Sequence, residues 1–284
     1  MASLKDIRRR IRATKSMQQI FKAMEMVAAA KLRRAQLRAQ AASPYAEKIT
    51  QMLDNLAGAA SELDHPLFRQ REVRTTALVV ITADRGFAGT YNSNVLRYAE
   101  GRVNEAAAGA VQIVALGRKA RDFLRRRHIP MLAVHTELPG EASLDFARRL
   151  TADLTELFVS EKVDRVEVVF TRFVNALVRK VQVEQFLPVG GATTGGGKDA
   201  GTIFEPNPER IFAELPPRYA TAKLYAAMAD ALASEHSARM VAMGSARKNA
   251  GELVDSLTLT RNRLRQAAIT REIAELVGGA EALK

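Results

Sequence analysis

Residues 4–42 read LKDIRRRIRATKSMQQIFKAMEMVAAAKLRRAQLRAQAA, with apolar or small side chains at steps of three or four. This spacing is typical of the narrow seam of a coiled coil rather than the wide apolar stripe of a core-facing helix. It predicts one long helix from about residue 4 to 57, kinked or loosened at Ser43–Pro44. The seam positions are Leu4, Ile7, Ile11, Thr14, Met17, Phe21, Met24, Ala28, Leu32, Ala35, Ala39 and Ala42.

The other end of the chain repeats the pattern. After the prolines at 206, 208, 216 and 217, a second long helix is predicted from about Arg218 to Val277. We expect the two helices to pack against each other, antiparallel. The second seam follows Leu224, Met228, Ala231, Ala238, Ala242, Ala246, Leu253, Leu257, Leu264 and Ala267.

Between the helices, short apolar runs alternate with amphipathic stretches. Strands are predicted at 75–82, 111–116, 131–135, 165–172 and 178–186, the last near a sheet edge, and helices at 92–108, 118–127 and 143–161. This order indicates a mostly parallel sheet. The predicted fold is thus α/β: a long antiparallel coiled coil of the N- and C-terminal helices plus a central Rossmann-like α/β domain. We divide the chain into 1–74, 75–206 and 207–284.

Composition excludes several classes of function. The chain has no cysteine, and its four histidines match no zinc spacing, so we expect neither thiol chemistry nor a metal site. No apolar run is long enough for a membrane span, and the start lacks the apolar core of a secretory signal. No catalytic serine, zinc-protease or cysteine–histidine motif occurs. We therefore expect no catalytic residue and no cofactor.

Charge is concentrated at the N-terminus. Residues 1–40 carry eleven basic side chains against Asp6 and Glu25, and the whole chain has a net charge of +12. A solvated helix face is the simpler interpretation. However, like charges at this density destabilise an isolated helix, which favours an acidic partner.

Two glycine-containing segments imitate phosphate loops. Residues 84–89 (DRGFAG) follow the first predicted strand but lack the third glycine of a dinucleotide motif, so we interpret them as a tight turn. Residues 195–199 (GGGKD) lack the first glycine and the hydroxyl of a P-loop. They lie in a glycine-rich stretch, 190–201, that predicts a mobile loop.

Two glycines, Gly244 and Gly251, lie within the second helix, where each costs about 1 kcal/mol relative to alanine. They are either simply tolerated or mark a close approach to a neighbour.

Four stretches together carry a family resemblance. KSMQQIFKAMEMVAAAKLRRA (15–35), DRGFAGTYNSN (84–94), SEHSARMVAMGSARKNAGEL (234–253) and NRLRQAAITREIAELVGGAEAL (262–283) resemble the gamma subunit of F-type ATP synthases, in the order of that family. The last stretch fits the pattern I-T-x-E-x-x-[DE]-x-x-x-[GA]-A from Ile269 to Ala280, with Arg271 at the variable position.

The resemblance implies a rotating central stalk without catalytic sites, which would lie on the beta subunits. Its partners would be the alpha and beta subunits, an epsilon subunit and the membrane c-ring, with no nucleic acid and no small-molecule substrate. The implied location is the cytoplasmic face of a bacterial plasma membrane, to which the chain would bind peripherally. The start of the chain, without a presequence, also favours a bacterial protein.

The resemblance also implies contact residues for each partner. Contacts with a beta subunit would involve Lys22, Met24, Arg265 and Gln266, and contacts with the membrane ring would involve Ile203, Phe204 and Glu205. The apolar tip that turns in a collar would comprise Leu276, Val277, Ala280 and Leu283.

Two other classes of function remain as alternatives. A basic coiled-coil nucleic-acid-binding protein would explain the charge, but the chain has no tryptophan and few aromatic stacking surfaces. A nucleotide-dependent enzyme would use the α/β domain but lacks a complete phosphate-binding motif.

Overall fold

The computed structural model describes residues 3–59, 65–107, 109–189 and 208–281. It divides into two compact units. The smaller contains residues 1–28 and 240–284, and the larger contains residues 29–239. The glycine-rich segment 190–201 lies outside the described residues.

The larger unit is built on a five-stranded sheet with the order β3-β2-β1-β4-β5. Four strands are parallel and β5 lies at one edge, as predicted. The structure adds that β5 pairs antiparallel with β4. The central strand β1 is buried along its whole length, which explains its continuous apolar run. The strands are β1 (Thr76–Ile81), β2 (Val111–Leu116), β3 (Met131–His135), β4 (Arg165–Phe173) and β5 (Arg179–Leu187).

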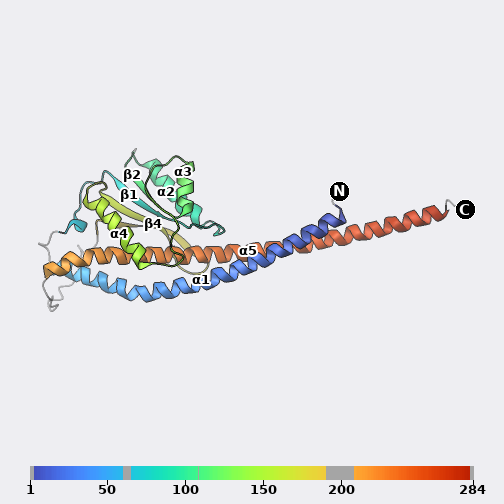
Figure 1. Ribbon diagram of the computed structural model, residues 1–284, viewed down its shortest axis with the longest axis horizontal. Helices are drawn as coiled ribbons and strands as arrows, with labels where there is room; N and C mark the ends of the chain where they lie inside the picture. The colour runs from blue at the N-terminus through green and yellow to red at the C-terminus, as the bar shows by residue number, and fades with distance from the viewer. Residues whose placement is uncertain (1–2, 60–64, 108, 190–207, 282–284) are drawn as a thin grey trace. The chain divides into compact units, whose positions relative to one another are not determined.

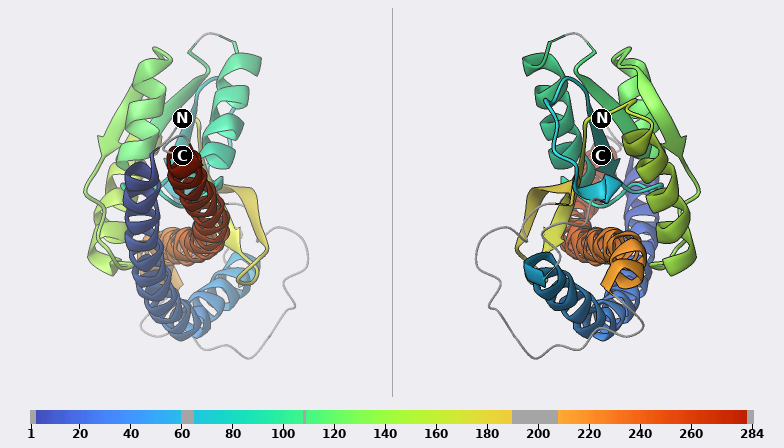
Figure 2. Two further views of the ribbon diagram at one scale, coloured as in Figure 1. Left: turned by 90° about the vertical axis from the view of Figure 1, so that its right-hand side faces the viewer. Right: turned by 90° about the vertical axis from the view of Figure 1, so that its left-hand side faces the viewer.

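Helices cover both faces of this sheet (Figures 1 and 2). On one face, α2 (Tyr91–Glu105) and α3 (Arg118–Arg126) pack over Leu78, Val80 and Ile113. On the other face, α4 (Leu144–Val159) buries one apolar stripe in the core. Parts of the two long helices complete that second layer, through Ile49 and Leu53 of α1 and Leu224 of α5. A 3₁₀ turn, η1 (Pro66–Phe68), precedes the first strand.

The first long helix, α1 (Leu4–Ala59), agrees with the predicted range to within two residues. Ser3 caps it: the Ser3 hydroxyl accepts a hydrogen bond from the Asp6 backbone N–H at 3.2 Å and donates one to the Asp6 carboxylate at 2.9 Å. The helix continues through Pro44 without a break.

The second long helix, α5 (Pro208–Glu281), begins ten residues earlier than predicted. Pro216 and Pro217 lie inside it, so the interpretation of this proline pair as the end of a loop was wrong. The physical reason is tertiary packing: Leu215 and Pro216 are buried, and Leu215 belongs to the core of the larger unit. Burial of that apolar surface offsets the backbone hydrogen bonds that the two prolines cannot make.

In the smaller unit, α1 and α5 are antiparallel, as predicted. Ile7 and Ile11 form a cluster with Val254, against which Leu257 and Leu264 pack. The seam of α5 was misplaced by one residue at its middle: Leu253 is 49% exposed, whereas Val254 is 8% exposed. A helix of 3.6 residues per turn drifts relative to a 3.5-residue repeat, so either of two neighbouring positions can face the other helix. Leu253 and Val254 are both hydrophobic, and residue type alone does not distinguish them.

Among the described residues, no helix combines the length and the apolar character that a membrane span requires.

Candidate functional site

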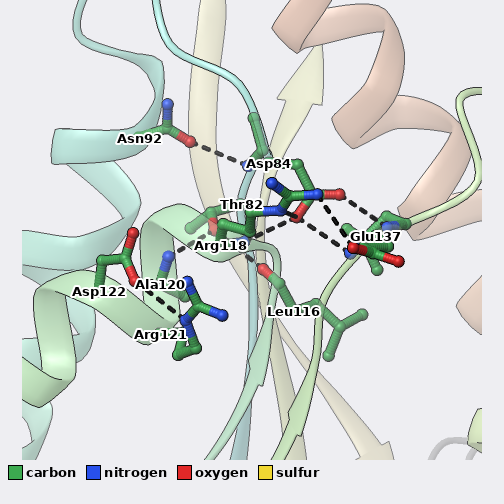
Figure 3. A network of polar contacts seen from close by, with 11 residues as sticks. Thr82, Asp84, Asn92, Leu116, Arg118, Ala120, Arg121, Asp122 and Glu137 are labelled. Carbon is green, nitrogen blue, oxygen red and sulfur yellow. Dashed lines mark hydrogen bonds and ion pairs between the residues drawn. The ribbon is translucent and has the colours of Figure 1, made fainter.

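Open α/β sheets usually bind ligands outside the carboxyl ends of their parallel strands, a region that here includes the ends of β1, β2 and β3. Here this place is occupied by the chain itself (Figure 3). The carboxylate of Asp84, which follows β1, accepts hydrogen bonds from the backbone N–H of Arg118 at 2.8 Å and of Leu138 at 2.7 Å. A third, longer bond at 3.3 Å comes from Glu137 N–H. Asp84 thus supplies the negative charge at the N-terminus of α3 that a phosphate would otherwise supply.

The turn between β2 and α3 is closed equally tightly. The Thr82 hydroxyl donates to the Leu116 carbonyl and accepts from the Ala120 N–H, both at 2.9 Å. Gly117 has φ of +95°, and a Cβ there would lie 2.5 Å from the Thr82 carbonyl oxygen. The backbone of Thr82, directly after β1, therefore fills the space next to the start of α3.

The segment 84–89 has a different role that its sequence did not indicate: it binds Arg239 of α5 through the Gly86 carbonyl. The Arg239 guanidinium donates to the Gly86 carbonyl through Nε at 3.3 Å and Nη2 at 3.2 Å. Nη2 also donates to the Glu235 carboxylate at 2.7 Å. Burial raises the pKa of Glu235, and Arg239 opposes that shift. Ala83, Ala88 and Tyr91 pack with Ala238 beside this network.

Within the smaller unit, two glycines of α5 face α1, so close approach is the correct alternative. A Cβ at Gly244 would lie 3.2 Å from the Glu25 carboxylate, and one at Gly251 would lie 2.9 Å from Gln18 Nε2. Arg247 Nε donates to the same Glu25 carboxylate at 2.8 Å. Small residues therefore leave room for a polar contact between the two helices.

The cluster of basic side chains near the N-terminus lies on the surface of α1. Its eleven basic side chains within residues 1–40 are all exposed. Of the predicted beta-subunit contacts, Lys22, Arg265 and Gln266 are exposed, and Met24 is half-buried. Leu276 and Val277, predicted for the apolar tip, are 75% and 59% exposed.

Most of the remaining predicted contact residues lie outside the described part of the chain. Ile203, Phe204, Glu205 and Leu283 lie outside the described residues, and Ala280 is described only as part of α5.

For metal binding, the described residues contain no cluster of three or more histidine, aspartate or glutamate side chains that could hold an ion. The described residues thus form a closely packed α/β unit and a paired-helix surface that is rich in exposed cations and apolar side chains.

Known proteins share both the sequence and the fold. The gamma chain of ATP synthase from Moorella thermoacetica is 46% identical over 285 residues and covers 100% of both chains. The gamma chain from Heliobacterium modesticaldum is also 46% identical over 100% of both chains. A chain in the OSCP/F1/c-ring structure of Euglena gracilis mitochondrial ATP synthase has a TM-score of 0.70 and 21% identity. That alignment covers 99% of this chain and 94% of the other.

A second Euglena gracilis structure, of the rotor of the same enzyme, has a TM-score of 0.68 with 20% identity. It covers 94% of this chain and 98% of the other. At these identities the structures show a common fold. The relationship itself rests on the sequences, because residues 3–283 also match the family model described as ATP synthase. This chain belongs to the ATP synthase gamma-chain family.

Proposed function

We propose that this chain is the central-stalk rotor subunit of a bacterial F-type ATP synthase. It would couple proton flow through the membrane c-ring to ATP synthesis or hydrolysis on a ring of alpha and beta subunits. One observation carries the proposal: identity of 46% with gamma chains of bacterial ATP synthases over the full length of both. The aligned length includes the exposed helical pair as well as the α/β unit.

The subunit itself would be non-catalytic, with the active sites on the beta subunits. Support comes from the Asp84 carboxylate, which accepts hydrogen bonds from the backbone N–H groups of Arg118 and Leu138. These groups would otherwise be free to bind a phosphate at the carboxyl ends of the strands. The isolated chain should then neither bind ATP tightly nor hydrolyse it. Micromolar ATP binding in equilibrium dialysis would contradict this.

The helical pair would turn inside the alpha/beta ring. Apolar side chains of α5 that neither unit covers, such as Leu259 and Ile273, are 60% and 56% exposed and would be covered there. The exposed cations of α1 suit acidic segments of the beta subunits. The α/β unit would contact the epsilon subunit and the c-ring, with Ile203, Phe204 and Glu205 at the ring. This places the chain peripherally at the cytoplasmic face of the plasma membrane.

Arg265 and Gln266 would form a catch with a beta subunit. Both are exposed on α5, and an arginine can hold a carboxylate with two parallel hydrogen bonds. A partly buried contact of this kind contributes about 1.5–3 kcal/mol, enough to define a pause in rotation. Arg265→Ala should therefore slow ATP-driven rotation while the complex stays assembled. Unchanged dwell times and torque in single-molecule rotation would exclude the catch.

The deciding experiment is purification of the native protein from solubilised membranes. We expect alpha, beta and epsilon subunits to co-purify, together with the c-ring in mild detergent. Co-purification of RNA or DNA instead would favour a nucleic-acid-binding protein, an alternative that the comparisons do not support.

A further inference from the structure

A cavity of about 190 Å³ lies within the larger unit, between the two long helices and the loop that joins β3 to α4. Residues 31–38 of α1 form one wall, residues 229–236 of α5 form another, and residues 140–142 of the loop close it. It shares no lining residue with the Asp84 network.

The cavity is cationic. Lys31, Arg34 and Arg38 line it from one face of α1, at a spacing of three and then four residues. Arg38 forms an ion pair with Glu141 of the loop. Among the residues that the structure describes, Lys31 and Arg34 form no hydrogen bond or close ion pair, although Lys31 is near enough to the Glu235 carboxylate to lower its pKa. Three cations therefore face one carboxylate, and two of them are available to a ligand.

His236 adds a neutral donor. Its side chain is 5% exposed, and its Nδ1 lies 3.3 Å from Arg239 Nη1. Because a guanidinium only donates, Nδ1 must accept, and the ring proton is on Nε2. Burial, with help from Arg239 and Lys31, lowers the pKa of His236 to about 4. At neutral pH its Nε2–H is thus an uncharged donor, without a partner in the described part of the chain.

The remaining lining favours a small, strongly charged ligand. Ala35, Ala142, Ala229 and Leu232 contribute apolar surface and no side-chain acceptor that would compete with an anion for the cations. The volume corresponds to about six waters at roughly 30 Å³ each. That is enough for one phosphate with bound water or for two linked phosphoryl groups.

We propose that this cavity binds a small inorganic phosphate anion, phosphate or pyrophosphate, held by Lys31 and Arg34 of α1 beside the Nε2–H of His236. The anion would bridge α1 to α5 inside the larger unit and would compete with Glu141 for Arg38. The proposal does not depend on the rotor function, because every group that it uses belongs to this unit.

The test is isothermal titration calorimetry of the purified full chain with phosphate, pyrophosphate and ATP in a phosphate-free buffer. We expect saturable binding, tighter for pyrophosphate than for phosphate because it carries more charge. Lys31→Gln and Arg34→Gln should each weaken binding by about tenfold, since each removes one charge-assisted contact. Arg33→Gln is the matched control: Arg33 is an exposed cation on α1 that does not line the cavity.

Glu141→Gln makes the test sharper because the expected effect is a gain. It removes the only carboxylate of the cavity lining and frees Arg38, so binding should tighten several-fold. Circular dichroism melts establish that each variant is folded. Three results would overturn the proposal: no saturable binding to the parent chain, equal losses in Arg33→Gln and Arg34→Gln, or no gain in Glu141→Gln. ATP binding tighter than pyrophosphate binding would reject the small-anion assignment.

Discussion

At the residue scale, Asp230 is a half-buried acid with a perturbed pKa. Burial raises its pKa to about 6, Glu184 adds to the shift, and Arg172 opposes it. An acid whose folded pKa is raised stabilises the fold at low pH, and that stabilisation is lost as the pH rises from about 4 to 6.

Asp230→Asn should therefore leave stability unchanged below pH 4 and raise it above pH 6. The gain should be about 1–2 kcal/mol, discounted for partial exposure. Urea unfolding across this pH range measures it. Arg172→Gln should make the loss of stability with rising pH larger and extend it to higher pH, since removal of the opposing charge raises the folded pKa of Asp230 further. A pH-independent effect of Asp230→Asn would show that the carboxylate is well solvated.

The backbone conformation at position 117 requires a glycine. An alanine Cβ there would meet a carbonyl oxygen at 2.5 Å in the left-handed region, so Gly117→Ala should destabilise the protein by about 2–3 kcal/mol. Gly101→Ala in α2 is the control, because a Cβ there has no atom within 4 Å. It should stabilise by about 0.5–1 kcal/mol through helix propensity. Similar melting temperatures for the two variants would contradict the tight turn.

At the element scale, α1 presents Met24 next to Glu25, whose carboxylate binds Arg247 of α5. A lysine at position 24 would place a new cation on the surface proposed to face an acidic segment of a beta subunit. Met24→Lys should then reduce ATP-driven proton pumping more than ATP hydrolysis, because the new ion pair would resist rotation.

Met17→Lys is a suitable comparison for Met24→Lys, since Met17 lies on the same helix and is 47% exposed. The contact assigned to position 24 is incorrect if both variants lose pumping and hydrolysis equally, or if neither loses either activity.

The elements also show how far sequence reasoning reaches. Strands β2 and β3 were predicted to the residue, because turn residues flank short apolar runs. The start of α5 was missed, since it depends on the burial of Leu215 in the core. The Asp84 network was also beyond reach: its donors are 34 and 54 residues away along the chain. Sequence could mark Asp84 as a loop residue but could not indicate what it binds.

At the scale of the whole molecule, the two units differ in how much apolar surface they bury. The sheet of the larger unit is covered on both faces, whereas the smaller unit leaves Met26, Ile273 and Leu276 more than half exposed. Few buried apolar contacts allow local opening at low free energy.

In the isolated chain, backbone amides of residues 4–28 and 240–281 should therefore exchange with solvent far faster than those of β1 and β4. Assembly with alpha and beta subunits should slow exchange in the helices and leave the strands unchanged. Hydrogen exchange followed by mass spectrometry measures both states. Equal protection of helices and strands in the free chain would mean that the pair is stable without a surrounding partner.

The boundary between the two units falls inside α1 and α5, at residues 28–29 and 239–240, and neither helix is interrupted there. An α-helix turns by about 100° per residue. Residues inserted into a helix therefore also rotate the side chains that follow the insertion. Adding one residue to either helix at this boundary would turn the side chains beyond it by roughly a quarter turn about that helix's own axis, while adding seven would restore their phase to within about 20°. An insertion at this boundary therefore changes which side chains of one helix face the other more than it changes the length of the helix.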